Sequence, residues 1–424
     1  MNFIEELKWR NMLHQMTDGA DEHVANGGRV GYIGFDPTAP SLTIGNYVQV
    51  MLLNLFQRSG NTPIVLMGGA TGRIGDPSGK DKERELKTEE ELDANLSRQL
   101  AEVRRFINFE DGPNKAIIAN NLDFYKEMNV LDFMRNVGKT LTVNYMLSKE
   151  SVKKRLETGI SFTEFSYQLL QGYDFQCLYK RHGCTVQMGG SDQWGNITAG
   201  TEFVSRNLRA KAHGVTTPLL TKADGTKFGK STAGNIWMNG DMTSPYKFFQ
   251  FWINAADSDI PKFIRYFTFK TKEQVEAEEA QYADDPRMLK KLLAEELTKR
   301  IHGDESFQAV EKVSDLLFNK KAKKETLLSL SSKDLATVAE EIPSFKVSKD
   351  ALSSGLNIID LMAENTSIVP SKSEARRAIK GQAVSVNKDK VKDAETVINH
   401  ESLLHGRYMM LENGKKNKFM LVAD

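Results

Sequence analysis

Cysteine and long hydrophobic runs are scarce in this sequence. The two cysteines among 424 residues, Cys177 and Cys184, are too few for a disulfide scaffold, and neither stands in a metal-ligand spacing with the histidines. We therefore expect reduced thiols and no resident metal ion. The longest apolar stretch, residues 48–56, is far shorter than the run of about 20 residues that crosses a bilayer.

The chain also lacks an excess of charge of either sign. Lysine plus arginine number 57 and aspartate plus glutamate number 56, which gives a formal net charge of +1. Such a chain has no general attraction for polyanions, so any RNA contact must come from a local basic cluster, and DNA is not an expected partner. The N-terminal stretch carries no apolar signal core, and we expect a cytoplasmic protein without a membrane partner.

Short apolar runs alternate with amphipathic helical patterns in the first half of the chain. One helix is marked by Thr88 and Glu91, which have the spacing of a capping box and precede apolar residues at helical intervals. This alternation predicts an α/β fold with a Rossmann-like parallel sheet covered by helices on both faces. The predicted strands are residues 30–35, 64–67, 116–119, 185–188 and 218–221.

Strand order decides where a ligand binds in such a sheet. If the five strands lie in the order 3-2-1-4-5, the order reverses between the first and the fourth strand, and a crevice opens at their carboxyl ends. Residues after Phe35 then face residues after Met188. The stretch 30–46 is a strand, a turn and a helix start, and the free amides and dipole of a helix start attract phosphate.

Composition separates the rest of the chain into further parts. A helical insertion is expected at about residues 130–180 of the first domain. A segment rich in Lys, Glu and Leu then predicts an α-helical domain, and a final segment with one helix and short strands predicts a small C-terminal α+β domain. The predicted boundaries are 1–245 for the catalytic domain, 246–340 for the helical domain, 341–355 for a linker and 356–424 for the C-terminal domain.

Three glycine-containing loops invite comparison with phosphate-binding motifs. GDPSGKD at 75–81 and GGATGRIG at 68–75 fit neither a P-loop nor GxGxxG, which argues against a P-loop ATPase and a dehydrogenase. TKADGTKFGKST at 221–232 places Lys227 and Lys230 three positions apart. Alone, this pair is typical of a surface turn. Together with the turn and helix start at residues 36–46, whose free amides attract phosphate, the pair predicts a clamp for a polyphosphate.

Several segments together resemble one enzyme family. FDPTAPSLTIGN is similar to the HIGH-motif segment of class I aminoacyl-tRNA synthetases, and KFGKS is similar to their KMSKS loop. With GGATGRIGDPSGK, ISFTEFSYQLLQGYDF and QMGGSDQWGNITAG in family order, the chain resembles the bacterial-type tyrosyl-tRNA synthetases over almost its whole length. The resemblance implies tyrosine and ATP as substrates, a tRNA as partner, and a magnesium ion carried by ATP.

The resemblance also implies which residues act on ATP. Attack of the tyrosine carboxylate on the α-phosphate needs alignment and charge stabilisation, and it needs no protein nucleophile. The residues that the resemblance implies therefore carry hydroxyl, amide or cationic side chains, together with three glycines and two aspartates. For catalysis they are Thr38, Thr43, Asn46, Lys80, Arg84, Lys227 and Lys230; for ATP binding they are Gly34, Asp36, Gly45, Gly190, Asp192, Gln193 and Lys230.

A second implied set binds the amino acid. Its members are Tyr32, Asp76, Tyr167, Gln171, Asp174 and Gln187. The family pattern assigns Tyr32 and Asp174 to the phenolic hydroxyl, and the carboxylate, phenol and amide oxygens of the next residues to the α-ammonium. Tyr167, Gln171 and Asp174 stand four and three positions apart, so one helix face presents all three. Each alone is typical of an ordinary core or surface residue.

The C-terminal segment carries a local basic cluster. Most of it falls on one face of a predicted helix, and the segment resembles the alpha-L RNA-binding fold, which implies phosphate contacts with tRNA. The family is homodimeric, with the interface near residues 132–144. The cluster consists of Lys372, Arg376, Arg377 and Lys380, followed by Lys415, Lys416 and Lys418 in a later turn, with Tyr408 near enough to stack on a base.

One departure from the family pattern leaves alternatives open. Thr43 and Asn46 replace both histidines of the HIGH motif. We expect tyrosine activation to persist, since both residues keep a hydrogen-bond donor and KFGKS is intact. One rival is an RNA-binding protein on a retired synthetase fold, which tyrosine-dependent pyrophosphate exchange would exclude. The other is a small-molecule nucleotidylyltransferase, which adenylate formation without tRNA charging would favour.

Overall fold

The computed structural model describes residues 1–76, 78, 87–231, 234–319, 321–414 and 417–424. Its internal contacts divide the chain into two compact units. The first unit contains Met1–Thr243 and Phe251–Leu293, and the second contains Ser244–Gln250 and Ala294–Asp424.

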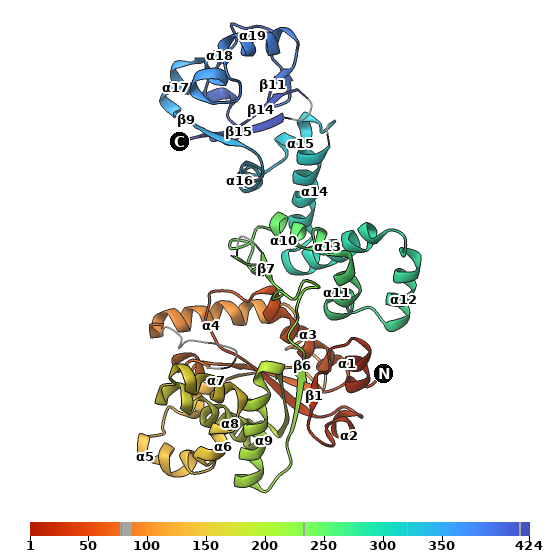
Figure 1. The fold of residues 1–424 in the computed structure, drawn as a ribbon, viewed down its shortest axis with the longest axis vertical. Helices are drawn as coiled ribbons and strands as arrows, with labels where there is room; N and C mark the ends of the chain where they lie inside the picture. The colour runs from red at the N-terminus through yellow and green to blue at the C-terminus, as the bar shows by residue number, and fades with distance from the viewer. Residues whose placement is uncertain (77, 79–86, 232–233, 320, 415–416) are drawn as a thin grey trace. The chain divides into compact units, whose positions relative to one another are not determined.

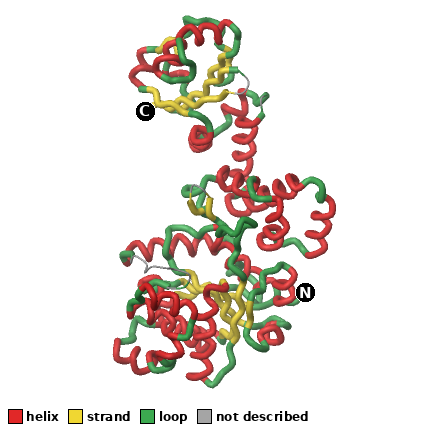
Figure 2. Tube along the Cα trace, viewed as in Figure 1, coloured by secondary structure: helices red, strands yellow, loops and turns green. Residues whose placement is uncertain are grey.

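A six-stranded sheet forms the centre of the first unit (Figures 1 and 2). Its order is β1-β6-β5-β2-β3-β4, and all neighbours are parallel except β1, which is antiparallel to β6. The predicted order 3-2-1-4-5 is therefore confirmed, with a short antiparallel strand added at one edge. The strands are β1 (Gln15–Met16), β2 (Val30–Phe35), β3 (Thr62–Met67), β4 (Ile117–Asn120), β5 (Cys184–Gly190) and β6 (His213–Thr217).

The predicted position of the fifth strand is wrong. The strand is β6, in which all five residues are buried, and residues 218–220 form no strand. β-branched Val215, Thr216 and Thr217 suit a buried strand, whereas Pro218 has no N–H for sheet pairing and ends it. The predicted strand, residues 218–221, therefore begins directly after the observed strand ends at Thr217.

Helices cover both faces of this sheet. The crossover helix α3 (Ile44–Arg58) joins β2 to β3, and α9 (Trp194–Leu208) joins β5 to β6. Because these right-handed crossovers run in opposite directions from the centre, they lie on opposite faces. Figure 1 shows α4 (Glu89–Val103) on the side of α3, and α8 (Phe162–His182) beside α9.

Local signals fix where these helices begin and end. The Thr88 hydroxyl accepts a hydrogen bond from the Glu91 N–H and caps α4, as predicted. Gly183 ends α8 in the left-handed conformation at φ 63°. The other helices of the first unit are α1 (Phe3–Trp9), α2 (Ala20–Val24), α5 (Val130–Phe133), α6 (Val143–Leu147), α7 (Glu150–Thr158), α11 (Ile260–Phe267) and α12 (Lys272–Gln281).

The second unit combines helices with a five-stranded sheet of order β12-β11-β14-β15-β9. The stretch expected to be a linker carries β9 and α17, and β9 pairs in parallel with β15, so this stretch is part of that sheet. The strands are β9 (Ser344–Val347), β11 (Val384–Val386), β12 (Asp389–Lys390), β14 (Tyr408–Asn413) and β15 (Asn417–Ala423). The helices are α14 (Asp304–Phe318), α15 (Lys324–Leu328), α16 (Ser332–Glu341), α17 (Lys349–Ser354), α18 (Ile358–Asp360) and α19 (Lys372–Lys380).

Two further helices, α10 (Pro245–Ile253) and α13 (Pro286–His302), contribute residues to both units. Two pairs of two-residue strands form small ladders beside the main sheets: β7 (Lys230–Ser231) pairs with β8 (Gly234–Asn235), and β10 (Leu356–Asn357) pairs with β13 (Val397–Ile398). Both cysteines are free and buried. Within the described ranges, every helix is too short or too polar to span a bilayer.

Candidate active site

The carboxyl ends of β2 and β5 meet at the centre of the first sheet, as predicted. Tyr32 on β2 is in register with Gln187 on β5. The Tyr32 ring packs edge-on against Phe175 of α8 with ring centroids 5.2 Å apart. A methyl group on Gly200 of α9 would lie 2.8 Å from Oε1 of Gln187. Both side chains therefore point to the face that α8 and α9 cover.

On the same face, Asp174 of α8 is removed from water. Only 1 % of its surface is exposed. Its carboxylate accepts hydrogen bonds from Nδ2 of Asn121 (2.9 Å) and from the Tyr125 hydroxyl (2.8 Å). Burial raises the pKa of this carboxyl to about 7, although the two hydrogen bonds act in the opposite direction. Asp174 is thus a buried carboxylate with one donor on each oxygen, and each oxygen can accept a further hydrogen bond.

A second carboxylate, Asp36, stands at the end of β2. It accepts hydrogen bonds from the Thr71 hydroxyl (2.6 Å) and the Tyr167 hydroxyl (2.9 Å). Nδ2 of Asn121 also donates to the Thr71 hydroxyl at 3.0 Å. Asn121 therefore connects the environments of Asp36 and Asp174, and it fixes both carboxylates against one scaffold.

Three buried oxygens among the predicted tyrosine-binding residues have no hydrogen-bond partner in the described structure. They are the Tyr32 hydroxyl, Oε1 of Gln171 and Oε1 of Gln187. A buried polar group without a partner costs about 1–3 kcal/mol. The three oxygens come from β2, α8 and β5, the elements around the crevice. Each of them therefore has the capacity to form a further hydrogen bond.

Asp76 lies in the same region and holds the turn after β5 in place. It accepts hydrogen bonds from the Ser78 N–H (2.9 Å), Nε2 of Gln193 (2.7 Å) and Nδ2 of Asn196 (3.4 Å). Gln193, which we expected at ATP, is therefore also a support for Asp76. Asp192 beside it is exposed; partial desolvation and the charge of Asp76 raise the pKa of its carboxyl, and Lys227 acts in the opposite direction.

The two residues in the positions of the HIGH histidines bond to one another. The Thr43 hydroxyl accepts from the Asn46 N–H (3.2 Å) and donates to Oδ1 of Asn46 (2.7 Å), which also accepts from the Thr43 N–H (3.0 Å). This is a capping box at the start of α3. Nδ2 of Asn46 donates to no described residue, and it remains available to a ligand at this helix start.

Three side chains on one face of α4 hold the turn that precedes α3. Asn95 donates to the Pro37 carbonyl (3.2 Å) and Gln99 to the Ala39 carbonyl (2.7 Å). Glu102 accepts from the Ser41 hydroxyl (2.7 Å) and the Leu42 N–H (2.8 Å). Residues 37–42 are irregular, so these bonds replace the sheet or helix pairing that would otherwise fix them. The sequence analysis missed all three residues.

The lysine loop lies against the same helix start. Gly229 has φ 81°, and a side chain there would meet the Ile44 side chain at 3.1 Å and the Gly45 nitrogen at 3.2 Å. The Ile44 N–H donates to the Ile236 carbonyl at 2.9 Å. Phe228 is buried in an aromatic cluster, whereas Lys227 and Lys230 are exposed. The loop is therefore anchored by its apolar residues, and both lysine side chains are exposed to solvent.

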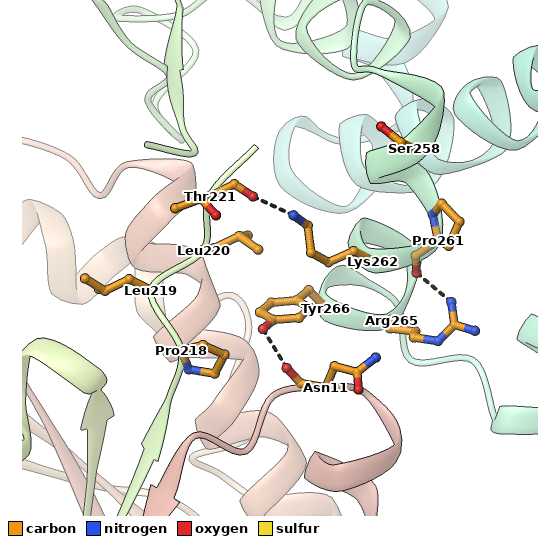
Figure 3. Close-up of a pocket in the computed structure, with 10 residues that line it drawn as sticks. All are labelled: Asn11, Pro218, Leu219, Leu220, Thr221, Ser258, Pro261, Lys262, Arg265 and Tyr266. Atoms are coloured by element: carbon orange, nitrogen blue, oxygen red, sulfur yellow. Dashed lines mark hydrogen bonds between the residues drawn. The ribbon is translucent and has the colours of Figure 1, made fainter. Parts of the chain in front are cut away.

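A hollow of about 570 Å³ lies where the chain leaves β6 toward the lysine loop (Figure 3). Nζ of Lys262 donates to the Thr221 carbonyl (2.5 Å), and the Tyr266 hydroxyl donates to the Asn11 carbonyl (2.8 Å). These polar groups bond within the chain. The walls of the hollow thus fix the segment from Pro218 to Thr221, which starts the lysine loop.

The basic cluster of the second unit is only partly available. In α19, Ala375 and Ile379 are buried, whereas Arg376, Arg377 and Lys380 are exposed. Lys372 instead forms ion pairs with Asp360 (2.7 Å) and Glu364 (2.8 Å). The exposed side of α19 therefore carries three cations.

Two expectations about the neighbouring turn are wrong. Tyr408 is 5 % exposed and packs into the core between α16 and the sheet, so it is unavailable for base stacking. Lys418 is buried, and its ammonium donates to the Leu316 carbonyl and, at 3.1 Å, to the Leu317 carbonyl. It satisfies carbonyls at the end of α14. A Lys-rich pattern in the sequence does not distinguish this role from phosphate binding.

Four predicted site residues lie outside the described residues: Lys80, Arg84, Lys415 and Lys416. The described structure connects several of the remaining first-unit predictions, since Tyr167 bonds Asp36 and Gln193 bonds Asp76. Thr71, Asn121 and Asn196, which bond Asp36, Asp174 and Asp76, were missed. The sequence signal that could have pointed to such close contacts was the glycines beside them. A side chain on Gly68 would lie 2.1 Å from Oδ1 of Asp36.

Across the described ranges, no three His, Cys, Asp or Glu side chains gather as a metal site requires.

Comparison with known families gives two matches. The family described as tRNA synthetases class I (W and Y) matches residues 28–319. The family described as the Tyrosine–tRNA ligase SYY-like C-terminal domain matches residues 334–422. Together they span both units.

Individual relatives match along the whole chain. The tyrosine–tRNA ligase of Cytophaga hutchinsonii is 49% identical over 424 residues, with 99% of each chain covered. That of Bacteroides fragilis is 47% identical over 430 residues, with both chains fully covered. A C-terminally truncated mitochondrial tyrosyl-tRNA synthetase from Aspergillus nidulans superposes with a TM-score of 0.67 at 30% identity, covering 75% of this chain and 94% of the other.

Proposed function

The chain belongs to the class I tRNA synthetases of the tryptophan and tyrosine group, and on that premise we propose how its residues divide the reaction. The activity is ligation of tyrosine to tRNA. Tyrosine and ATP form tyrosyl-adenylate and pyrophosphate, and the tyrosyl group then passes to the 3′-terminal ribose of the tRNA.

The unpaired buried oxygens carry the assignment of the tyrosine site. The phenolic hydroxyl of tyrosine donates to Asp174 and accepts from the Tyr32 hydroxyl, which otherwise has no partner. Oxygens of Asp76, Tyr167 and Gln171 accept from the α-ammonium. Tyr167 keeps this capacity because its proton is donated to Asp36. Gln187 lines the pocket beside Tyr32.

ATP binds between the α3 start and the lysine loop. Thr38, Thr43 and Asn46 contact its phosphates from one side, and Lys227 and Lys230 close from the other. The charge that develops on the phosphates is stabilised by these ammonium groups, by the α3 dipole and by Lys80 and Arg84. Magnesium is expected to arrive with ATP and to be held by its phosphates. The ribose and adenine side is lined by Gly34, Asp36, Gly45, Gly190, Asp192 and Gln193.

Removing the Glu102 carboxylate should weaken ATP binding. Glu102→Ala leaves the Ser41 hydroxyl and the Leu42 N–H without their acceptor, so the turn loses two bonds at its junction with α3. We expect the KM for ATP to rise roughly 10-fold, as for loss of hydrogen bonds to a charged group, with little change for tyrosine. Ser97→Ala on the exposed face of α4 is the control. An unchanged KM for ATP would contradict a role for this contact.

We propose that the chain acts as a homodimer in the cytoplasm. Four large apolar side chains are exposed close together in sequence: Val130 (67 %), Leu131 (76 %), Met134 (46 %) and Val143 (59 %). They fall at the segment where the family resemblance places the dimer interface. Exposed apolar residues in such a group are typical of an association surface.

Leu131→Asp should therefore shift the protein from dimer to monomer in sedimentation velocity at micromolar concentration. A carboxylate in an apolar self-complementary interface is desolvated twice, once for each subunit. Leu328→Asp, at an exposed leucine of α15, is the matched control and should stay dimeric. A wild-type protein that sediments as a monomer would overturn the proposal.

For the tRNA, we propose that Arg376, Arg377 and Lys380 contact its phosphates, together with Lys415 and Lys416. Lys372 contributes less because two carboxylates already neutralise it. Charging of tRNA with labelled tyrosine tests the function as a whole. Tyrosyl-tRNA that forms only with ATP is the expected result. Adenylate formation without charging would favour the nucleotidylyltransferase alternative.

A further inference from the structure

Tyr125 donates a hydrogen bond to Asp174, the residue that we assign to the phenolic hydroxyl of the substrate. It directly follows the 3₁₀ turn Asn121–Phe124 after β4. Its hydroxyl lies 2.8 Å from Oδ1 of Asp174 and 2.9 Å from the Leu170 carbonyl. Within α8 the Leu170 carbonyl already accepts the main-chain bond of the residue four positions later. The Asp174 carboxylate is therefore the partner that most needs the single hydroxyl proton.

The geometry leaves Asp174 one fixed donor on each oxygen. Nδ2 of Asn121 bonds Oδ2 and the Tyr125 hydroxyl bonds Oδ1. The Tyr125 ring is held in place against Tyr173, with centroids 5.5 Å apart. Both oxygens keep a second lone pair for a substrate hydroxyl. The carboxylate plane is thereby set before the substrate enters.

We propose that Tyr125 is a positioning residue that holds Asp174 oriented and ionised, and that it thereby determines how strongly the enzyme rejects phenylalanine. This inference rests on the proposed assignment of Asp174 to the phenolic hydroxyl. Phenylalanine offers no donor, so an ionised Asp174 beside it stays buried with fewer bonds than it can accept. A protonated, neutral Asp174 tolerates the same neighbour at a smaller cost.

Selectivity should consequently depend on pH. Burial raises the pKa of Asp174 to about 7, and loss of the Tyr125 hydrogen bond removes one of the two contacts that lower it. Discrimination between tyrosine and phenylalanine should rise as the pH increases from 6 to 8. In Tyr125→Phe the rise should begin at a higher pH. The titratable groups that face Asp174 from the packed elements are Tyr32 of β2, Asp36 directly after β2, Tyr125, and Tyr167, Tyr173 and Cys177 of α8.

The test measures kcat/KM for tyrosine and for phenylalanine in pyrophosphate exchange between pH 6 and 8. Tyr125→Phe keeps the ring against Tyr173 and removes only the hydroxyl. We expect selectivity at neutral pH to fall roughly 10- to 100-fold, as for one hydrogen bond to a charged group, with the KM for ATP unchanged. Tyr125→Leu, a second variant with different packing, should shift the profile in the same direction. Tyr179→Phe, which removes a hydroxyl elsewhere on α8, should match the wild type.

The outcomes distinguish a failure of the positioning role of Tyr125 from a failure of the proposed tyrosine site. Wild-type selectivity that varies with pH, together with a displaced profile in both Tyr125 variants, supports the positioning role. Profiles of these variants that coincide with the wild type overturn it, even if activity falls, since a purely structural defect lowers activity for both amino acids alike. A wild type that shows no tyrosine-dependent exchange contradicts the tyrosine site itself.

Discussion

Lys230→Ala is expected to slow tyrosine activation by about 10²- to 10³-fold, the usual cost of removing one group that stabilises developing charge. Lys230 is exposed on a loop whose apolar residues are anchored against the α3 start. Its ammonium can therefore approach the polyphosphate while the loop base stays in place. The proposed tyrosine site is formed by residues of β2, β5 and α8 and does not include the lysine loop. Its dissociation constant should stay unchanged.

Single-turnover formation of tyrosyl-adenylate measures this effect, and equilibrium dialysis measures tyrosine binding. Lys8→Ala removes an exposed lysine from α1 and controls for the change in net charge. An activation rate equal to that of the wild type would show that the lysine loop does not act on ATP. Weakened tyrosine binding in Lys230→Ala would instead indicate a misfolded crevice.

Asp174→Asn should reduce kcat/KM for tyrosine by about 10²-fold, because an ionised acceptor is replaced by an amide whose NH₂ faces existing donors. Asn121 and Tyr125 both donate to this side chain, and in the proposed complex the substrate hydroxyl is a third donor. The amide oxygen cannot accept all three. Asp123→Asn, at an exposed aspartate paired with Lys126, is the matched control and should retain wild-type kinetics.

The same substitution should stabilise the free protein at pH 8. The pKa of Asp174 is raised in the fold to about 7 from an ordinary value near 4. The folded state therefore holds a proton that the unfolded state has released, and the stability linked to that proton is lost as the pH rises through 7. Thermal unfolding should show Asp174→Asn more stable than wild type at pH 8 and similar to it at pH 4. Equal midpoints at pH 8 would contradict the raised pKa.

Much of the fold could be predicted from the sequence because its signals are local. The run from Val30 to Phe35 is apolar and bounded by polar turns, and it forms β2 as predicted. Thr88 at the start of α4 acts as the expected cap. The strand at 213–217 was misplaced because its apolar pattern continues through Pro218 to Leu220, and only the proline signals the end. Ser344–Val347 alternates too weakly to reveal that it pairs with β15.

The candidate site residues were predicted from motifs, whereas the residues that bond and orient them could not be predicted from the sequence. Glu102 is one of many charged residues in α4, and only the structure shows that it bonds the turn before α3. Tyr125 and Asn121 act on Asp174 from about 50 positions away along the chain. Such contacts depend on strand order and helix rotation, which single-sequence periodicity does not fix. The Thr43–Asn46 pair similarly reads as two substitutions, yet it forms one capping unit.

The most direct test of the account is ATP–pyrophosphate exchange by the wild-type protein with tyrosine, with phenylalanine and with no amino acid. We expect exchange that requires tyrosine, far less with phenylalanine, and none without an amino acid, although Thr43 and Asn46 stand in the positions of the HIGH histidines. Folded protein that catalyses no exchange with any amino acid would contradict it. RNA binding on a retired synthetase fold would then be the surviving explanation.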